Sequence, residues 1–219
     1  MSSNSSKKSI DIIYKQTPLY KFLDYCEQEI EAVDGKHQKQ YKVLDCGAGG
    51  DMPPLGLFYS KGYITTGIEF DEKQIEKAEI FSLQNELALD IVKGDMTELK
   101  FDDDSFDFVY SYNSVFHMKK VQIAQAIKEM KRVLKPKGLL FLNFLSVDDF
   151  RCGEGPDLGN HQYEQMDDEP VIHSYFTYDE AEQYFDDMEF VVKERRIIER
   201  IYEGERIKQG FIDYIIRKR

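Results

Sequence analysis

The chain of 219 residues contains no tryptophan, few cysteines and no long apolar run. Cys26, Cys46 and Cys152 are odd in number and far apart, and none belongs to a C-x-x-C pair, so they indicate neither a disulfide framework nor a zinc site. The longest apolar stretch, residues 138–147, is interrupted by Asn143 and is shorter than the ~20 residues that a membrane helix requires. We therefore expect reduced thiols and no association with a membrane.

Positive charge is also scarce, because 29 Lys and Arg residues face 41 Asp and Glu residues, for a net charge of −12. Proteins that bind nucleic acid need a basic surface to displace counterions from phosphates, so nucleic acid is not an expected partner. The first eight residues are rich in Ser and Lys and lack the apolar core of a secretory signal. This leader and the cysteine content together predict a cytoplasmic protein.

Two hydrophobic periods alternate through most of the chain. Apolar, β-branched runs typical of strands occur at residues 41–45, 63–69, 87–92, 106–112 and 139–145. Between the last two runs, Ile123, Ile127, Met130 and Leu134 follow helical spacing up to the Lys-Pro-Lys-Gly segment at 135–138. Strands that alternate with helices predict an α/β fold with a parallel sheet covered on both faces.

The C-terminal third has a different pattern. Two alternating runs, 190–201 and 207–216, are joined through Glu203-Gly204-Glu205 and predict an antiparallel hairpin. Before it, Thr177-Tyr-Asp-Glu180 matches a capping box for a helix to about Phe185. We therefore divide the chain into a polar leader with cap or lid helices at 1–35 and one domain at 36–219. Within that domain, residues 146–176 form a long loop inserted on the substrate side.

The turn after the first predicted strand reads Asp45-Cys-Gly47-Ala-Gly49-Gly50-Asp51. A glycine-rich turn between strand and helix lets a ligand approach the backbone, although the same glycines also suit a simple tight turn. The dinucleotide fingerprint G-x-G-x-x-G requires a third Gly where this chain has Met52, which disfavours NAD. Asp45 would repel a pyrophosphate but suits a ligand with an ammonium group and a positive sulfur.

Acidic residues also end the next two predicted strands. Glu69 occupies the position at which α/β nucleoside sites place an acid against the ribose hydroxyls. Gly94 is followed by Asp95 and Met96, a pair that could hold an adenine by its exocyclic amine and by its face. Each acid alone could be a solvated strand end, but the ends of neighbouring parallel strands meet at one sheet edge. There they predict a single ligand site.

In register, these motifs resemble the class I S-adenosylmethionine-dependent methyltransferases. The matching segments are VLDxGxG at 43–49, GIEFD at 67–71, KGDM at 93–96, SFDFV at 105–109 and EMKRVLKPKG at 129–138. The resemblance implies a Rossmann-like three-layer sandwich with a seven-stranded, mostly parallel sheet and an antiparallel C-terminal hairpin. It also implies S-adenosylmethionine as the cofactor. Asp51 departs from the third Gly with which the family often ends its turn.

The resemblance assigns each part of the cofactor to residues of this chain. By this assignment the methionine part is bordered by Asp45, Gly47, Ala48 and Gly49, the ribose by Glu69, the adenine by Phe70, Asp95 and Met96, and the region near the sulfur by Tyr112.

His117 follows the fourth predicted strand and is the candidate catalytic base, because the pKa of histidine is close to working pH. A structural role for this histidine stays open. A metal site built from His117, His161 and His173 with Asp167 or Asp168 has no supporting spacing, so no metal is expected.

The predicted activity is methyl transfer to a small-molecule acceptor. After the fourth strand the chain lacks both an Asn/Asp-Pro-Pro-Tyr motif and a Pro-Cys nucleophile, which argues against nucleic-acid bases and glutamine amides as acceptors. A non-catalytic module that binds S-adenosylmethionine or S-adenosylhomocysteine is one alternative, and a protein methyltransferase is another. Candidates for the acceptor pocket are Tyr14, Tyr20, Arg151, His161, Tyr163, His173, Tyr175 and Phe176.

Overall fold

The computed structural model of the chain describes residues 14–15, 17–34 and 40–219. Most of the predicted leader at the N-terminus lies outside these residues. The cap region is represented by Tyr14 and by the helix α2 (Pro18–Asp34). Within the described part of the chain, no helix is both long enough and apolar enough to cross a membrane.

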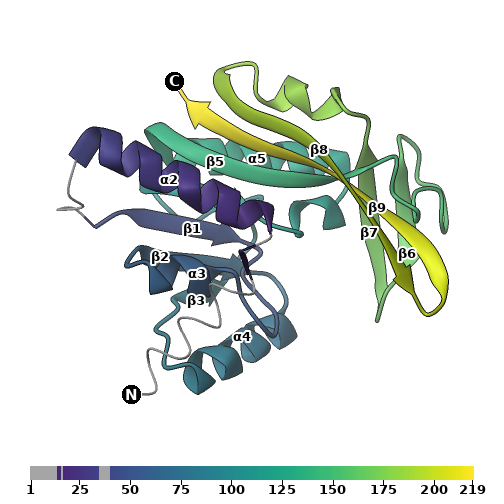
Figure 1. Cartoon of the computed structure of the whole chain (residues 1–219), viewed down its shortest axis with the longest axis horizontal. Coiled ribbons are helices and arrows are strands. Elements are labelled where there is room, and N and C mark those ends of the chain that lie inside the picture. The colour runs from purple at the N-terminus through teal and green to yellow at the C-terminus, as the bar shows by residue number, and fades with distance from the viewer. Residues whose placement is uncertain (1–13, 16, 35–39) are drawn as a thin grey trace.

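A mostly parallel sheet forms the centre of the molecule (Figure 1). Its parallel strands are β1 (Lys42–Cys46), β2 (Ile64–Glu69), β3 (Ile91–Lys93), β4 (Phe106–Ser111) and β5 (Leu134–Ser146), in the spatial order β3-β2-β1-β4-β5. The hairpin of β8 (Met188–Tyr202) and β9 (Glu205–Lys218) is antiparallel and joins the sheet where β9 pairs with β5. The predicted Rossmann-like sheet with a reversed C-terminal hairpin is therefore confirmed.

The described residues form nine strands rather than the predicted seven, because the insert is not a loop. It contains a second antiparallel hairpin, β6 (Gln162–Met166) and β7 (Pro170–Phe176), and β7 pairs with the end of β5. The predicted helix after it is only the short 3-10 helix η2 (Glu180–Tyr184), in which the Thr177 amide donates to the Glu180 carboxylate at 3.1 Å.

Helices cover both faces of the sheet. On one face, α2 and α3 (Leu55–Ser60) pack against apolar side chains of β1, β4 and β5. On the other, α5 (Lys120–Val133) packs against the alternate side chains of the same strands, and α4 (Glu72–Gln84) lies beside β3 at the sheet edge. Phe22 of α2 and Ile123 of α5 are completely buried, and burying each such side chain contributes about 1.5–3 kcal/mol. This packing fixes where the strands end.

Candidate functional site

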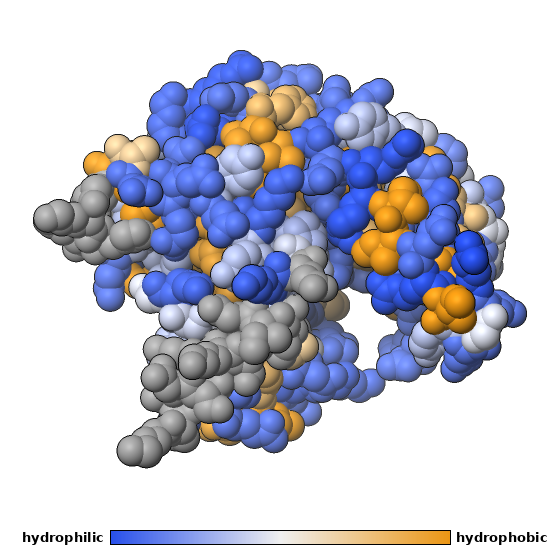
Figure 2. All heavy atoms as spheres, viewed as in Figure 1, coloured by the Kyte–Doolittle hydropathy of each residue, from blue (hydrophilic) through white to orange (hydrophobic). Residues whose placement is uncertain are grey.

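A cavity of about 820 Å³ opens at the carboxyl ends of β1 to β4. These four strands are parallel neighbours, and β1 lies between β2 and β4. The strand order therefore changes direction at β1, and ligands of open α/β sheets usually bind at such a topological switch point. In the space-filling view a hole lies between the lower part of the molecule and the hairpins on the right (Figure 2). The cavity is lined by eight of the ten predicted site residues: Gly47, Gly49, Glu69, Phe70, Asp95, Met96, Tyr112 and His117.

The glycine-rich turn presents bare backbone to this cavity. Gly47 and Gly50 have positive φ angles of 102° and 101°, which favour glycine. A Cβ atom on Gly47 would lie 2.0 Å from the Ser114 hydroxyl oxygen, and one on Gly49 would lie 2.8 Å from a carboxylate oxygen of Glu69. Asp51, the departure from the family pattern, is not among the residues with positive φ and is therefore compatible with the turn.

Glu69 ends β2 and is held by three backbone amides. Its Oε2 atom accepts a hydrogen bond from the Gly49 N–H at 3.1 Å, and Oε1 accepts from Phe70 at 2.8 Å and Asp71 at 3.0 Å. These bonds orient the carboxylate before any ligand arrives. Oε2 keeps the capacity to accept a further hydrogen bond from a hydroxyl group.

Asp95 and Met96 follow β3 on the same edge of the cavity. The Oδ1 atom of Asp95 accepts from both the amide and the hydroxyl of Thr97 at 2.7 Å, so the remaining capacity of this carboxylate lies on Oδ2. Phe70 is 72% exposed although it lines the cavity. An exposed aromatic ring beside an acid and a thioether suits a flat heteroaromatic group with an amine.

Asp45 and Ala48 are not among the residues that line the cavity. Asp45 is buried and accepts a hydrogen bond from the Tyr110 hydroxyl at 2.7 Å. The pKa of Asp45 is raised to about 8. Burial is the main cause and the charge of Glu69 adds to it, whereas the hydrogen bond from Tyr110 acts in the opposite direction. Ala48 is buried against Gly67, where a Cβ atom would approach within 2.5 Å. The assignment of these two residues to the methionine part stays a prediction.

The end of β4 is tied to β5 by two asparagines. The backbone amide of Asn113 donates to the side-chain oxygen of Asn143 at 2.7 Å, and the Asn143 side-chain amide donates back to the side-chain oxygen of Asn113 at 2.6 Å. Asn113 has a φ of 54°, a backbone conformation that asparagine tolerates. This pair fixes the positions of Tyr112 and Ser114 in the cavity wall. Ser114 was not singled out from the sequence, and its place directly after the fourth strand was the available signal.

His117 ends the 3-10 helix η1 (Val115–His117) and lines the cavity. Burial and the neighbouring His173 lower the pKa of His117 to about 4, against the opposing charge of Asp167. The imidazole is therefore uncharged at neutral pH and able to accept a proton. In the described part of the chain, no group of three His, Cys, Asp or Glu side chains is arranged to hold a metal ion.

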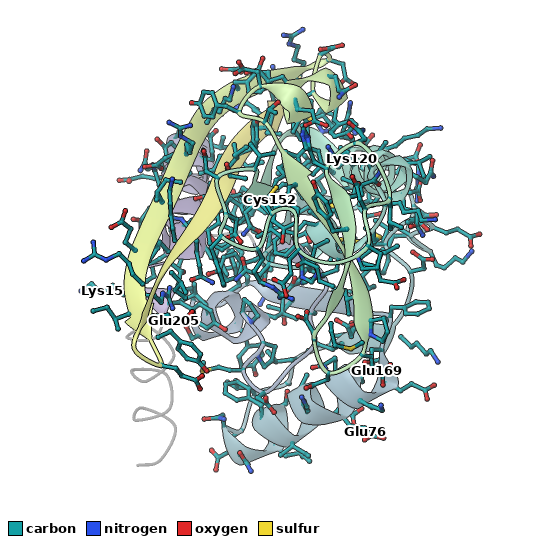
Figure 3. All side chains as sticks on the ribbon, turned by 90° about the vertical axis from the view of Figure 1, so that its right-hand side faces the viewer. Lys15, Glu76, Lys120, Cys152, Glu169 and Glu205 are labelled. Carbon is teal, nitrogen blue, oxygen red and sulfur yellow. The ribbon has the colours of Figure 1, made fainter. Side chains whose placement is uncertain are left out.

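The β6–β7 hairpin closes the cavity on the side of His117. Val171, Ile172 and Asp167 of this hairpin line the cavity, none of them predicted to do so, although Asp167 had been considered as a metal ligand. Figure 3 shows Glu169 at the turn of this hairpin near α4, and the β8–β9 turn with Glu205 on the other side. The Glu169 carboxylate lies 3.1 Å from the Lys73 ammonium group of α4.

Most of the predicted acceptor residues lie elsewhere. Tyr14 lines the cavity, and its hydroxyl donates to the carbonyl of Met52. The others stand outside the cavity lining: Tyr20, Arg151, His161, Tyr163, His173, Tyr175 and Phe176. Tyr163 and Tyr175 contact each other in a small apolar cluster.

The arrangement fits S-adenosylmethionine. Gly47 and Gly49 line the cavity with backbone alone, because a Cβ atom at either position would clash with neighbouring side chains. Carboxylates at two strand ends can accept hydrogen bonds from hydroxyl and amine groups. Glu69, Asp71, Asp95 and Asp167 line the cavity, and they favour a ligand that carries positive charge.

Comparison with known proteins agrees with this chemistry. Residues 44–142 match the family described as "Methyltransferase domain", a segment that runs from β1 into β5 and includes the cavity-lining ends of β1, β2, β3 and β4.

Three similar proteins illustrate the match. A sterol 24-C-methyltransferase of Neurospora crassa is 36% identical over 105 residues, which cover 46% of this chain and 27% of that protein. The 27-O-demethylrifamycin SV methyltransferase of Amycolatopsis mediterranei is 33% identical over 109 residues, 48% of this chain and 39% of that protein. A solved SAM-dependent methyltransferase of Methanosarcina mazei has a TM-score of 0.64 at 24% identity and covers 85% and 96% of the two chains. The chain thus spans well under half the length of these two curated relatives.

Proposed function

We propose that this chain, a member of the class I S-adenosylmethionine-dependent methyltransferase family, transfers a methyl group from S-adenosylmethionine to a small-molecule acceptor. The observation that carries the proposal is the meeting of four consecutive parallel strand ends around one cavity of about 820 Å³. A cavity of that size is in the range of sites for cofactors and small organic ligands.

The chain's own residues would hold the cofactor by its polar groups. Glu69 accepts hydrogen bonds from the ribose hydroxyls, Asp95 accepts one from the adenine amine, and Phe70 and Met96 contact the adenine ring. The backbone of Gly47 and Gly49 borders the methionine part, and Tyr112 lies near the sulfur. When bound, S-adenosylmethionine supplies an electrophilic methyl carbon on a positively charged sulfur.

The acceptor side is formed by Tyr14, His117 and the β6–β7 hairpin. The uncharged imidazole of His117 accepts the proton that the acceptor's nucleophilic atom gives up. Alignment and exclusion of water supply most of what methyl transfer needs, and Val171 and Ile172 of the hairpin contribute apolar surface to the cavity wall on that side. Because the hairpin narrows access, it favours a small acceptor over a protein chain.

Two measurements test the proposal. S-Adenosylhomocysteine at 100 times its dissociation constant should stabilise the protein by about 2.7 kcal/mol in thermal unfolding, and no stabilisation would contradict the cofactor site. Formation of S-adenosylhomocysteine from S-adenosylmethionine over a panel of small metabolites then tests transfer. Tight binding without product over the whole panel would favour the non-catalytic alternative.

We place the reaction in the cytoplasm. The unpaired state of Cys26, Cys46 and Cys152 supports a reducing compartment. Fractionation of cells that express the full chain tests this placement, and recovery outside the cytoplasmic fraction would contradict it.

A further inference from the structure

A second histidine lies directly behind the candidate base. His173, on β7, is 5% exposed, and its ring meets the His117 ring edge-to-face with 4.6 Å between centroids and an angle of 81°. His173 belongs to the β6–β7 hairpin, outside the residues 44–142 that match the family. The contact therefore joins a residue inside the matched segment, His117, to one outside it.

Charged groups also contact His173. Its Nε2 atom lies 3.6 Å from Oδ2 of Asp167, and Oδ1 of Asp167 accepts from the Arg151 guanidinium at 2.8 Å. Arg151 is also held by Glu154 at 3.0 Å. Arg151, Asp167, His173 and His117 thus form a chain of neighbouring side chains, and Asp167 and His117 both line the cavity.

The Nδ1 atom of His173 is buried and has no hydrogen-bond partner among the described residues. An unpaired buried nitrogen costs free energy, so an apolar ring would serve better if His173 only filled space. A histidine at this position is explained if its ability to bind a proton affects the neighbouring imidazole of His117.

We propose that His173 is a positioning residue for His117, holding that imidazole in the orientation in which it can accept a proton from the acceptor. The inference rests on the proposed function, because it concerns the same base. It makes the inserted hairpin part of the catalytic apparatus rather than only a cover.

The charges around the two rings agree with this role. Burial lowers the pKa of His173, whereas Asp167, the backbone of Val171 and Asp149 raise it, so a proton that enters the pair of imidazoles is held preferentially on His173. A proton there repels a second one on His117, whose pKa burial has already lowered. Arg151 disfavours protonation of both rings. Lys120, at the start of α5, pairs with Glu180 of η2.

The test is an NMR titration of the imidazole groups in the full chain, which contains only four histidines. His173→Phe keeps a ring against His117 but removes the titrating group, and we expect the pKa of His117 to rise above about 4, while burial, the larger cause, still holds it below its ordinary value of 6.5. Asp167→Asn should lower the pKa of His173. His161→Phe, an exposed residue of the same insert, is the matched control and should change neither.

Equal His117 pKa values in the His173→Phe and His161→Phe proteins would overturn the proposal. Asp167 is partly exposed at the hairpin turn, so Asp167→Asn still tests the proposal if His173→Phe does not fold, and an unchanged pKa of His173 in that variant would also overturn it.

The titration needs no acceptor, so its result is independent of the search for turnover. Once the panel yields an acceptor, His173→Phe should lower kcat about tenfold, move the acidic limb of the pH profile upward and leave KM for S-adenosylmethionine unchanged. Wild-type turnover by His117→Ala would instead reject the base assignment in the proposed function, while the titration still decides whether His173 controls His117.

Discussion

Replacing Glu69 by glutamine should weaken cofactor binding without unfolding the site. The Glu69→Gln substitution keeps the size of the side chain but removes the charge that strengthens hydrogen bonds from ribose hydroxyls. A lost charge-assisted hydrogen bond costs about 1.5–3 kcal/mol, or roughly one to two tenfold steps in dissociation constant. The amide also replaces one carboxylate oxygen with a donor, which faces a backbone N–H of Gly49, Phe70 or Asp71.

Isothermal titration calorimetry with S-adenosylhomocysteine measures this effect. Glu72→Gln is the matched control, because Glu72 is a nearby exposed acid that pairs with Lys93 and does not line the cavity. We expect its dissociation constant to stay within about twofold of the wild type. If Glu69→Gln and Glu72→Gln bind S-adenosylhomocysteine equally well, the ribose assignment of Glu69 is wrong.

Two further predictions concern the strand ends. The raised pKa of Asp45, about 8, means that the folded state holds this proton more tightly than the unfolded chain, so the free energy of unfolding falls as pH rises from 3.8 towards 8. Asp45→Asn should remove the contribution of Asp45 to this fall in the free energy of unfolding, measured by thermal unfolding without ligand at a series of pH values. Equally steep pH dependences in the wild type and the variant would contradict the prediction. Gly47→Ala combines a positive φ with a clash against Ser114 and should cost more than the ~1–3 kcal/mol of strain alone, whereas Gly62→Ala, with positive φ but open space, should cost only the strain. Equal losses for the two variants in chemical denaturation would refute the clash.

The central sheet and one side of the site could be predicted from the sequence. Hydrophobic period identifies strands and helices when one face is buried, and it identified β1, β2, β4, β5, α5 and the C-terminal hairpin. The parallel order then brings the ends of these strands to one edge, so Gly47, Glu69 and Asp95 meet although they are far apart in the chain.

Features that depend on packing between distant segments could not be predicted in this way. The β6–β7 hairpin has short strands with mixed polar and apolar residues, and its pairing to β5 is a tertiary contact that no local pattern records. For the same reason the sequence could not predict that the Asp45 side chain bonds to Tyr110, or that His117 contacts His173. Motif spacing predicts which residues reach a sheet edge, but not the direction of each side chain there.

A crystal structure with S-adenosylhomocysteine tests the central claim most directly. The account predicts the ribose hydroxyls on Glu69, the adenine beside Asp95 and Met96, and the sulfur on the side of the cavity where Tyr112 and His117 lie. Density for the nucleoside in any other place, or a ligand that touches none of these carboxylates, would contradict it.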